Sequence, residues 1–334
     1  MKRAKHLYPL IAAPENLKSA FVKAARGKRE YPEVIAFSRG FDRNIAALQR
    51  QLQEKDFDIG HYHFFVVRDP KVRAICAAAF PERVLHHAIM NVCEPEFEKR
   101  HIHDSYACRR GKGNLRAVVR AQQFARRNRW YLKLDIRKYF DCIDHETSME
   151  LLERAFHDAD LLFLFRKILA TYHTAPGKGI PIGNLFSQHL ANFYLSVLDH
   201  RLKEARNVKC YLRYMDDFML FSPDKQRLLD ELHAIRDFLR ERLHLELKNS
   251  VQLNQTRLGA PFLGHRIFPA HTRLLSGGLL RFSRRYREYE RNYCEGVWSE
   301  KELARRMEAL QAFVCSSDSL RFRKHFIGRF GVLS

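Results

Sequence analysis

Three aspartates, in two separate stretches of the 334-residue chain, are candidates for the metal ligands of a phosphoryl-transfer enzyme. Asp135 ends the stretch YLKLD, and Asp216 and Asp217 stand together inside the apolar run RYMDDFML. A carboxylate among apolar neighbours is costly to bury unless a cation meets it. Carboxylate oxygens suit Mg²⁺, and a pair of such ions can activate an attacking hydroxyl and stabilise a leaving oxyanion. The residues predict nucleotidyl transfer, provided that the two stretches converge.

The elements around these aspartates are predicted to bring them together. Residues 131–136 have strand propensity and partial alternation, with Asp135 near the strand's end. Residues 210–221 are expected to form two short strands joined by a tight turn at 215–217. If this hairpin pairs beside the first strand, the carboxylates converge and repel each other unless cations lie between them. On pattern alone, a solvated turn for the Asp pair and a helix cap for Asp135 remain open.

The rest of the chain alternates helical and strand-like stretches without repeats or long linkers. Helices are expected at 147–170, at 187–205 and at 224–243, because apolar residues recur there at helical spacing. A strand is expected at 243–247 (LHLEL) and a hairpin at 261–268 (PFLGHRIF).

The charge balance indicates a polyanionic partner. The chain carries 59 Lys and Arg against 38 Asp and Glu, a formal net charge of +21. Nucleic acid is the first expectation for such an excess and a membrane surface the competing one. No apolar stretch approaches the ~20 residues of a spanning helix, and no signal peptide is expected. Seven scattered cysteines suit reduced thiols in a cytoplasm.

Two basic segments are candidates for phosphate contact. Residues 105–129 contain eight Arg and Lys and no acid, and Asn114 is predicted to cap a helix there. Arg116, Arg120 and Arg127 would share one face of that helix, which could follow a phosphate backbone or could simply be solvated. The tail, residues 271–334, is expected to be a helical, basic module.

In order and in spacing, seven stretches resemble the motifs of the reverse transcriptase family. The resemblance covers roughly residues 60–270. It implies an α+β fold of the right-hand polymerase type, with fingers, a palm of antiparallel sheet backed by helices, and a helical thumb. The stretches are KVRAI (71–75), HDSYACRRGKG (103–113), LDIRKYFDCIDH (134–145), GIPIGNLFSQHLANFYLSVLD (179–199), RYMDDFML (213–220), and LHLEL with FLGHRI (262–267).

The resemblance also implies domain boundaries. The fingers would run over 1–128, with an inserted piece at about 147–178. The palm would occupy 129–270 and the thumb 271–334.

Residue by residue, the resemblance assigns the metal site. Asp135 and Asp216 match the two metal-binding carboxylates, the Ile136 carbonyl would add a backbone ligand, and Asp217 matches a third, supporting aspartate. The cofactor implied is a pair of Mg²⁺ ions, with Mn²⁺ as an alternative. Lys248 lies near the segment from which relatives supply a proton to the leaving pyrophosphate, although a solvated lysine is the more ordinary reading.

The nucleotide site follows from the same resemblance. Lys71 and Arg73 match fingers cations that meet the incoming triphosphate, where charge-assisted bonds are strong. Phe140 stands where the family has its sugar gate, which implies dNTP substrates. Ile182 and Gly183 match the loop under the nucleotide. A surface ion pair for Arg73 and a core position for Phe140 are the structural alternatives.

The predicted nucleic-acid contacts lie in the basic segment and in the primer-grip motif. Template RNA and a primer 3′ end are the implied partners. The residues are Arg109, Arg110, Lys112, Arg116, Arg120, Arg127, Phe262, Leu263 and Gly264.

One departure from the common family pattern indicates a subtype. The motif that usually begins with Gln-Gly has Ile182 and Gly183 here, and Gln188 replaces a proline. This form resembles the reverse transcriptases of diversity-generating retroelements. Those enzymes, cytoplasmic in bacteria and phage-infected cells, copy a template-repeat RNA into cDNA, misincorporate at adenines and work with a basic accessory variability protein.

Two alternatives to this subtype remain. One is another bacterial lineage of reverse transcriptases, defence-associated or group II intron-like. The other, from a different functional class, is a non-catalytic RNA-binding scaffold that keeps the polymerase fold.

Overall fold

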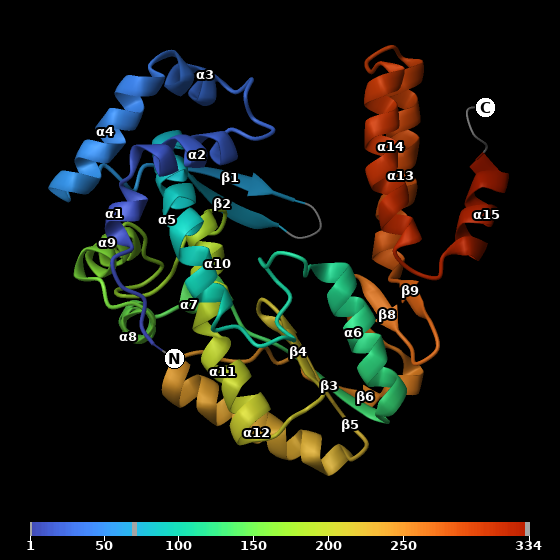
Figure 1. The fold of residues 1–334 in the computed structure, drawn as a ribbon. Helices are drawn as coiled ribbons and strands as arrows, with labels where there is room; N and C mark the ends of the chain where they lie inside the picture. Colours follow the sequence, from blue (N-terminus) through green and yellow to red (C-terminus); the bar gives the residue numbers. More distant parts are fainter. Residues whose placement is uncertain (1, 69–71, 331–334) are drawn as a thin grey trace. The chain divides into compact units, whose positions relative to one another are not determined.

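The computed structural model describes residues 2–68 and 72–330, which form two compact units. The chain passes repeatedly from one unit to the other, so each is assembled from segments that are distant in sequence (Figure 1). Unit 1 comprises Met1–Arg109, Asp135–Asn207 and Ala234–Asn249. Unit 2 comprises Arg110–Leu134, Val208–His233 and Ser250–Ser334.

Helix α5 (Phe80–Glu98) is the central helix of unit 1. Ten of its residues are buried, including Val84, Ala88 and Ile89, because it packs against α2 and α10 on different sides (Figure 1). A helix buried on several faces is expected to be apolar around most of its circumference. The other N-terminal helices are α1 (Tyr8–Ile11), α2 (Pro14–Ala24), α3 (Pro32–Arg39) and α4 (Phe41–Glu54).

The only two-stranded sheet among the described residues is the hairpin of β1 (Tyr62–Val67) and β2 (Arg73–Ala78). The strands are antiparallel, with Tyr62 opposite Ala78 and Val67 opposite Arg73. Only the end of β2 near Ala78 is buried, whereas β1 is exposed along most of its length.

The later helices of unit 1 are more broken than the sequence predicts. The helix expected at 147–170 is two helices, because the Asp158 carboxylate accepts a hydrogen bond from the Leu161 amide and starts a new one. The helix expected at 187–205 ends in a π-helical turn, Arg201–Ala205. The elements are α7 (Tyr139–Cys142), α8 (His145–Ala155), α9 (Ala159–Ala170), α10 (Leu185–Tyr194) and α11 (Ser196–His200).

Unit 2 is built on a four-stranded sheet in the order β4-β5-β3-β6. Strand β4 pairs antiparallel with β5, and β3 pairs antiparallel with β6. Helix α6 (Asn114–Arg127) packs against β4 and β5 through Ala117, Val118 and Ala121. The strands are β3 (Trp130–Asp135), β4 (Tyr211–Tyr214), β5 (Asp217–Ser222) and β6 (Gln252–Gln255), and α12 (Lys225–Leu243) follows β5.

The strand predicted at 243–247 is wrong. That segment makes one isolated bridge, between Leu247 and Ile136, and the regular strand β6 comes five residues later. The alternating apolar residues Leu243 and Leu245 are buried, but their segment follows α12 without regular strand pairing. Periodicity predicted the burial and not the pairing partner.

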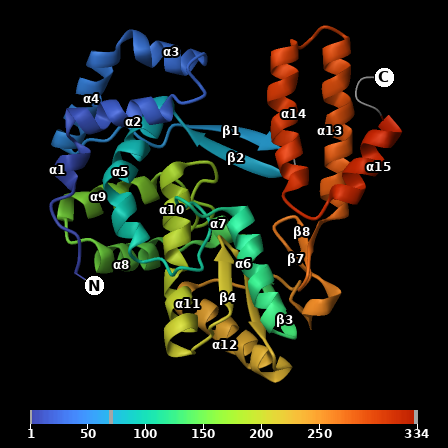
Figure 2. The same cartoon turned by 45° about the vertical axis from the view of Figure 1, so that its right-hand side comes forward.

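The C-terminal part of unit 2 is a small sheet followed by three helices. The sheet runs β7 (Ala260–Phe262), β8 (His265–Ile267) and β9 (Thr272–Leu274), all antiparallel. Helices α13 (Ser276–Cys294) and α14 (Glu300–Cys315) lie side by side (Figure 2), and α15 (Leu320–Phe330) packs on them. The buried cluster holding them contains Leu274, Phe282, Leu310, Val314 and Phe326.

The predicted fold class is confirmed as α+β with antiparallel sheets. Over the ranges that the structure describes, none of the helices combines the length and the apolar character that crossing a bilayer demands. The basic tail is helical as expected.

Candidate active site

The β4–β5 hairpin presents Asp216 and Asp217 as the sequence predicts. Tyr214 pairs with Asp217, which leaves Met215 and Asp216 as a two-residue turn. Met215 has φ 57°, in the left-handed region, and Asp216 does not. The turn is half-buried, whereas Phe218 and its neighbours are fully buried. The aspartates therefore lie at the end of a rigid, deeply packed hairpin.

Asp217 has a lysine partner that the sequence reasoning missed. Lys133 Nζ lies 3.3 Å from Asp217 Oδ2, and both side chains are 20% exposed. Lys133 belongs to β3, which is the neighbour of β5 in the sheet. The contact places the start of β5 beside the end of β3. The one signal in the sequence was a lysine alternating with Leu132 and Leu134 on a predicted strand.

Asp135, the last residue of β3 and the first residue of the second segment of unit 1, also meets a lysine. Lys248 Nζ lies 2.7 Å from Asp135 Oδ1, and the Lys248 amide donates to the Asp135 carbonyl at 2.8 Å. The two side chains are 37% and 26% exposed, so the pair is accessible to solvent. Ile136 is buried and bridges to Leu247. Lys248 thus lies beside the first aspartate, a position that the sequence alone did not determine.

Three segments of unit 1 that carry predicted nucleotide contacts are joined by backbone bonds. The Cys76 amide on β2 donates to the Ile182 carbonyl at 2.8 Å, and the Ile180 amide donates to the Phe140 carbonyl at 2.9 Å. Arg73 begins β2 and is exposed; Lys71 lies outside the described residues. The structure therefore brings the Arg73 strand, the Ile182 loop and the Phe140 turn into one neighbourhood.

Gly183 has a packing reason for being glycine. Its φ is +124°, and a Cβ there would lie 2.8 Å from Ile75 Cγ2 and 3.3 Å from the Cys76 carbonyl oxygen. The next residue, Asn184, is buried, and its Oδ1 accepts from the Ala78 amide at 3.1 Å. Gly183 and Asn184 hold the loop against β2.

Phe140 is half-buried, so it is neither a core residue nor fully exposed. The core position of α7 belongs to Tyr139, whose hydroxyl donates to the Ala191 carbonyl. The ring of Phe140 therefore remains available to a ligand.

Most residues of the predicted basic segment are at least partly exposed, but the prediction that Arg109 contacts nucleic acid is wrong. Its side chain is 7% exposed, and its donors are taken by the Glu98 carboxylate and by the carbonyls of Ile102 and Ser105. Arg109 holds the loop before α6 together and does not offer its guanidinium to phosphate.

The other stripe residues are placed as expected. Arg116 and Arg127 are exposed on α6, and the Arg120 guanidinium lies 4.5 Å from the Phe124 ring centroid. Asn114 is the first residue of the helix rather than its cap, because Gly113 takes the N-cap position with φ 102°. Arg110 is exposed and Lys112 half-buried.

The primer-grip motif forms a hairpin with Leu263 and Gly264 as its two-residue turn. Both have positive φ, 47° and 82°, which is the requirement of a type I′ turn. Phe262 is 1% exposed, so its side chain belongs to the core and only the tip can contact a ligand. His265 ties the hairpin to α14, since its Nε2 lies 3.1 Å from Ser316 Oγ; burial lowers the pKa of His265.

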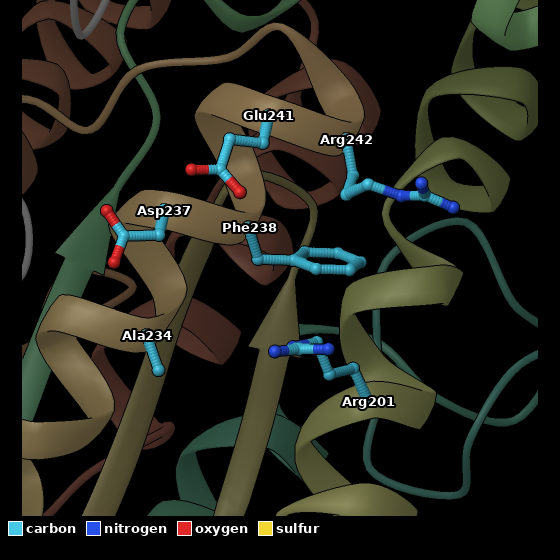
Figure 3. A pocket seen from close by; sticks show the side chains of 6 residues that line it. All are labelled: Arg201, Ala234, Asp237, Phe238, Glu241 and Arg242. Carbon is cyan, nitrogen blue, oxygen red and sulfur yellow. The ribbon is translucent and has the colours of Figure 1, made fainter.

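A separate hollow of about 560 Å³ lies in unit 1, between α12 and the π-helical turn (Figure 3). Its central feature is the Arg201 guanidinium, 4.8 Å from the Phe238 ring centroid. None of the predicted site residues lines it, and no sequence motif pointed to it. The lining residues are Arg201, Ala234, Asp237, Phe238, Glu241 and Arg242.

The predicted ligands have oxygen donors that suit a divalent metal ion, although, in the part of the chain that the structure describes, they do not form a compact cluster. Within the described residues no group of three or more His, Cys, Asp and Glu forms a metal-holding cluster. The carboxylates of Asp135 and Asp217 each attract an ammonium group, at 2.7 and 3.3 Å. Oxygen donors that draw cations in this way suit a hard divalent ion.

Comparisons with known proteins find similar sequences, similar structures and one matching family model. Protein YkfC of Escherichia coli strain K12 is 25% identical over 326 residues, covering 81% of this chain and 85% of that protein. The putative COX1/OXI3 intron 1 protein of Saccharomyces cerevisiae is 24% identical over 135 residues, 38% of this chain and 16% of that protein.

Among solved structures, a telomerase from Candida albicans in complex with a telomeric RNA fragment matches with a TM-score of 0.48 and 12% identity. The match covers 67% of this chain and 50% of the telomerase chain, so this chain spans about half of that protein's length. The family described as reverse transcriptase (RNA-dependent DNA polymerase) matches residues 68–267, more than half of the sequence. The chain belongs to the reverse transcriptase family.

Proposed function

We propose that this chain is an RNA-directed DNA polymerase in which Asp135 and Asp216 hold two Mg²⁺ ions and Asp217 supports them. The observation that carries the proposal is the Lys133–Asp217 ion pair, which puts the start of β5 beside β3. Asp135 comes two residues after Lys133 on the same strand, and alternate strand residues face the same side. Asp135 and Asp217 would therefore face the same side of the sheet, and Asp216 would lie next to them in the turn.

The residues around the proposed metal site have complementary roles. When bound, the ions would activate the primer 3′-OH and stabilise charge on the leaving pyrophosphate. The Ile136 carbonyl would add a ligand next to Asp135. Lys248 lies 2.7 Å from Asp135, within reach of a leaving oxygen held there, and we assign it the proton donation to pyrophosphate.

The proposed dNTP site uses the neighbourhood of β2. Arg73 and Lys71 would bind the triphosphate, and the half-buried Phe140 ring would exclude a 2′-OH. The bond from the Cys76 amide to the Ile182 carbonyl supports this, because it fixes the Ile182 and Gly183 backbone beside the strand of Arg73. Incorporation of rNTP should rise in Phe140→Ala relative to wild type.

Template and primer would follow the exposed basic surfaces. On α6 these are the exposed Arg116 and Arg127 with the half-buried Arg120, before the helix the exposed Arg110 with the half-buried Lys112, and on the primer grip the tip of Leu263 and Gly264. The proposed domains remain fingers 1–128 with the piece at about 147–178, palm 129–270 and thumb 271–334. Phosphate contacts predict that affinity for RNA falls steeply with rising salt.

For the subtype we propose the diversity-generating retroelement reading, with a basic accessory variability protein as partner. Its support is Ile182 in place of a polar residue and Gln188 in place of proline; the Gln188 amide makes the first hydrogen bond of α10, to the Asn184 carbonyl at 3.2 Å. The similarity to yeast intron proteins favours the second candidate, a group II intron-like enzyme. In Ile182→Gln, errors opposite template adenines should fall under the first reading and stay unchanged under the second.

Primer extension on an RNA template tests the enzyme assignment against the scaffold alternative. Asp216→Ala should lower incorporation by roughly a thousandfold or more, because metal stabilisation is worth several kcal/mol. Asp237→Ala is the matched control: Asp237 is an exposed residue of α12 that pairs with Arg240 at 3.2 Å. Equal activity of wild type and Asp216→Ala would contradict the proposal.

A further inference from the structure

A fully buried arginine stands next to the turn that carries Asp216. Arg213 is on β4 with 0% exposure and is the largest of the fully buried side chains among the described residues. A guanidinium keeps its charge at every accessible pH. Burying that charge is costly unless hydrogen bonds and charges compensate it. A strand of the core could accommodate an apolar residue there, so the arginine requires a specific reason.

The guanidinium reaches one particular carbonyl. Arg213 Nη1 donates to the Met215 carbonyl at 3.0 Å. That oxygen belongs to the peptide between Met215 and Asp216, the central peptide of the two-residue turn closed by Tyr214 and Asp217. The bond therefore acts on the peptide plane from which Asp216 begins.

This turn is strained at Met215. Its φ of 57° lies in the left-handed region, where a side chain costs roughly 1–2 kcal/mol and glycine costs little. Positive φ at the first turn position alone is the pattern of a type II′ turn, which normally has glycine there. A type I′ turn would need positive φ at Asp216 as well.

The two turn types differ by the orientation of the central peptide. Because the peptide is a rigid plane, rotating it over changes ψ of Met215 and φ of Asp216 together, and so redirects the Asp216 side chain. The hydrogen bond from Arg213 holds the carbonyl oxygen in the orientation observed. In that orientation φ of Asp216 is not positive.

We propose that Arg213 is a positioning residue of the active site: its buried guanidinium selects the turn conformation that aims the Asp216 carboxylate at the metal. This inference rests on the proposed function only for the identity of the metal site. It also gives Met215 a role, since its strained backbone offers the carbonyl that Arg213 binds. Lysine at 213 keeps the charge but loses the planar fork of donors.

The test is Mn²⁺ binding to the full chain, followed by electron paramagnetic resonance, for wild type, Arg213→Lys and Arg213→Gln. The Kd of the Asp216-dependent site should rise about tenfold to a hundredfold in Arg213→Gln, since a hydrogen bond involving a charged group is lost. Arg213→Lys should lie between the two. The apparent Mg²⁺ requirement for primer extension should shift in the same order.

A packing control separates positioning from simple destabilisation. Leu212→Val alters a fully buried neighbour on β4; it should lower the melting temperature and leave the Mn²⁺ Kd unchanged. If Arg213→Gln, still folded by circular dichroism, binds Mn²⁺ as wild type does, the inference is wrong. If the wild type binds Mn²⁺ through Asp216 but never extends a primer, the proposed function is wrong. The Mn²⁺ Kd values of the Arg213 variants would still decide the Arg213 inference.

Discussion

The two hairpins that carry motif residues, β1–β2 in unit 1 and β4–β5 in unit 2, have opposite environments. Phe218, Met219 and Leu220 on β5 are 0% exposed, whereas Phe64 and Phe65 on β1 are 61% and 44% exposed. The β4–β5 pair belongs to a four-stranded sheet covered by α6, while β1–β2 is a sheet of two strands. The proposed metal ligands thus stand on a rigid support, and Arg73 stands on an exposed one.

The exposed hairpin is held at its base instead of along its length. The Glu82 carboxylate accepts from the Gly60 amide at 2.8 Å, and the Tyr62 hydroxyl lies 2.6 Å from Thr171 Oγ1. Asn184 binds the other strand at Ala78. Isolated two-stranded hairpins are marginally stable in water, so these contacts at the base determine where Arg73 is placed.

The two hairpins also differ in the ionisation of the groups beneath them. Arg213, under the metal-site turn, does not titrate. The base of β1–β2 rests on Glu82, whose Oε1 lies 3.6 Å from His86 Nε2 in the core. Burial raises the pKa of Glu82 and lowers the pKa of His86. Each side chain is therefore neutral over a wider pH range in the folded protein than in the unfolded chain. As pH falls, His86 therefore lowers the stability of unit 1, whereas Glu82 acts with the opposite sign.

The largest effect is expected from truncating the buried hairpin. Phe218→Ala should lower the free energy of unfolding by about 3–5 kcal/mol, because a fully buried ring leaves a cavity. Denaturation in urea measures it. A cost below about 1 kcal/mol would mean that the β4–β5 hairpin is no better packed than β1–β2, and the comparison would fail.

A second test concerns the junction of β2 with the Ile182 loop. Gly183→Ala should cost about 2–4 kcal/mol, combining left-handed backbone strain with the contact to Ile75 Cγ2. Gly113→Ala is the closer control, since Gly113 has φ +102° and open space around it. Gly113→Ala should show the backbone strain without the contact. Equal costs for the two variants would remove the packing argument.

How far the sequence could predict these features depends on whether they are local. The turn between Tyr214 and Asp217, and the Leu263–Gly264 turn, follow from residues adjacent in the chain, and both are confirmed. The strand expected at 243–247 fails because pairing with Ile136 depends on a partner about a hundred residues away.

The ion pairs were beyond the sequence for the same reason. Lys133 and Lys248 are ordinary lysines until the fold sets each beside an aspartate at 3.3 and 2.7 Å. Arg109 looked like part of a basic stripe because nothing local reveals that Glu98 and two carbonyls occupy its donors. The contact of Arg213 was missed as well, although a charged residue in an apolar strand is a visible signal of a specific buried contact.

A smaller effect should follow from removing the buried histidine at the base of β1–β2. Both ring nitrogens of His86 lack hydrogen-bond partners in the described structure, and burial lowers its pKa to about 3. The unfolded chain takes up this proton below about pH 6.5 and the folded chain does not. Stability should therefore fall as pH drops from about 6.5 towards 3, by at most about 1.4 kcal/mol per pH unit from this group.

His86→Phe should remove that part of the acid sensitivity and keep or raise stability at pH 7, since the site adjoins the Phe186 ring. The measurement is urea denaturation of both proteins at several pH values between 4 and 8. The difference between the two free energies of unfolding reports His86 and not Glu82, because both proteins contain Glu82. The raised pKa of Glu82 acts with the opposite sign, since its contribution to stability declines as pH rises through the pKa of the folded state. Parallel pH profiles would contradict the assignment.

The smallest effect is expected at the exposed face of β1. Phe64→Ser should change the free energy of unfolding by no more than about 0.5 kcal/mol, because the 61% exposed ring gives up little burial. Denaturation at two protein concentrations measures it. A cost above about 1.5 kcal/mol that grows with concentration would mean that a second copy covers this face in solution, and the contrast between the two hairpins would then hold only for the isolated chain.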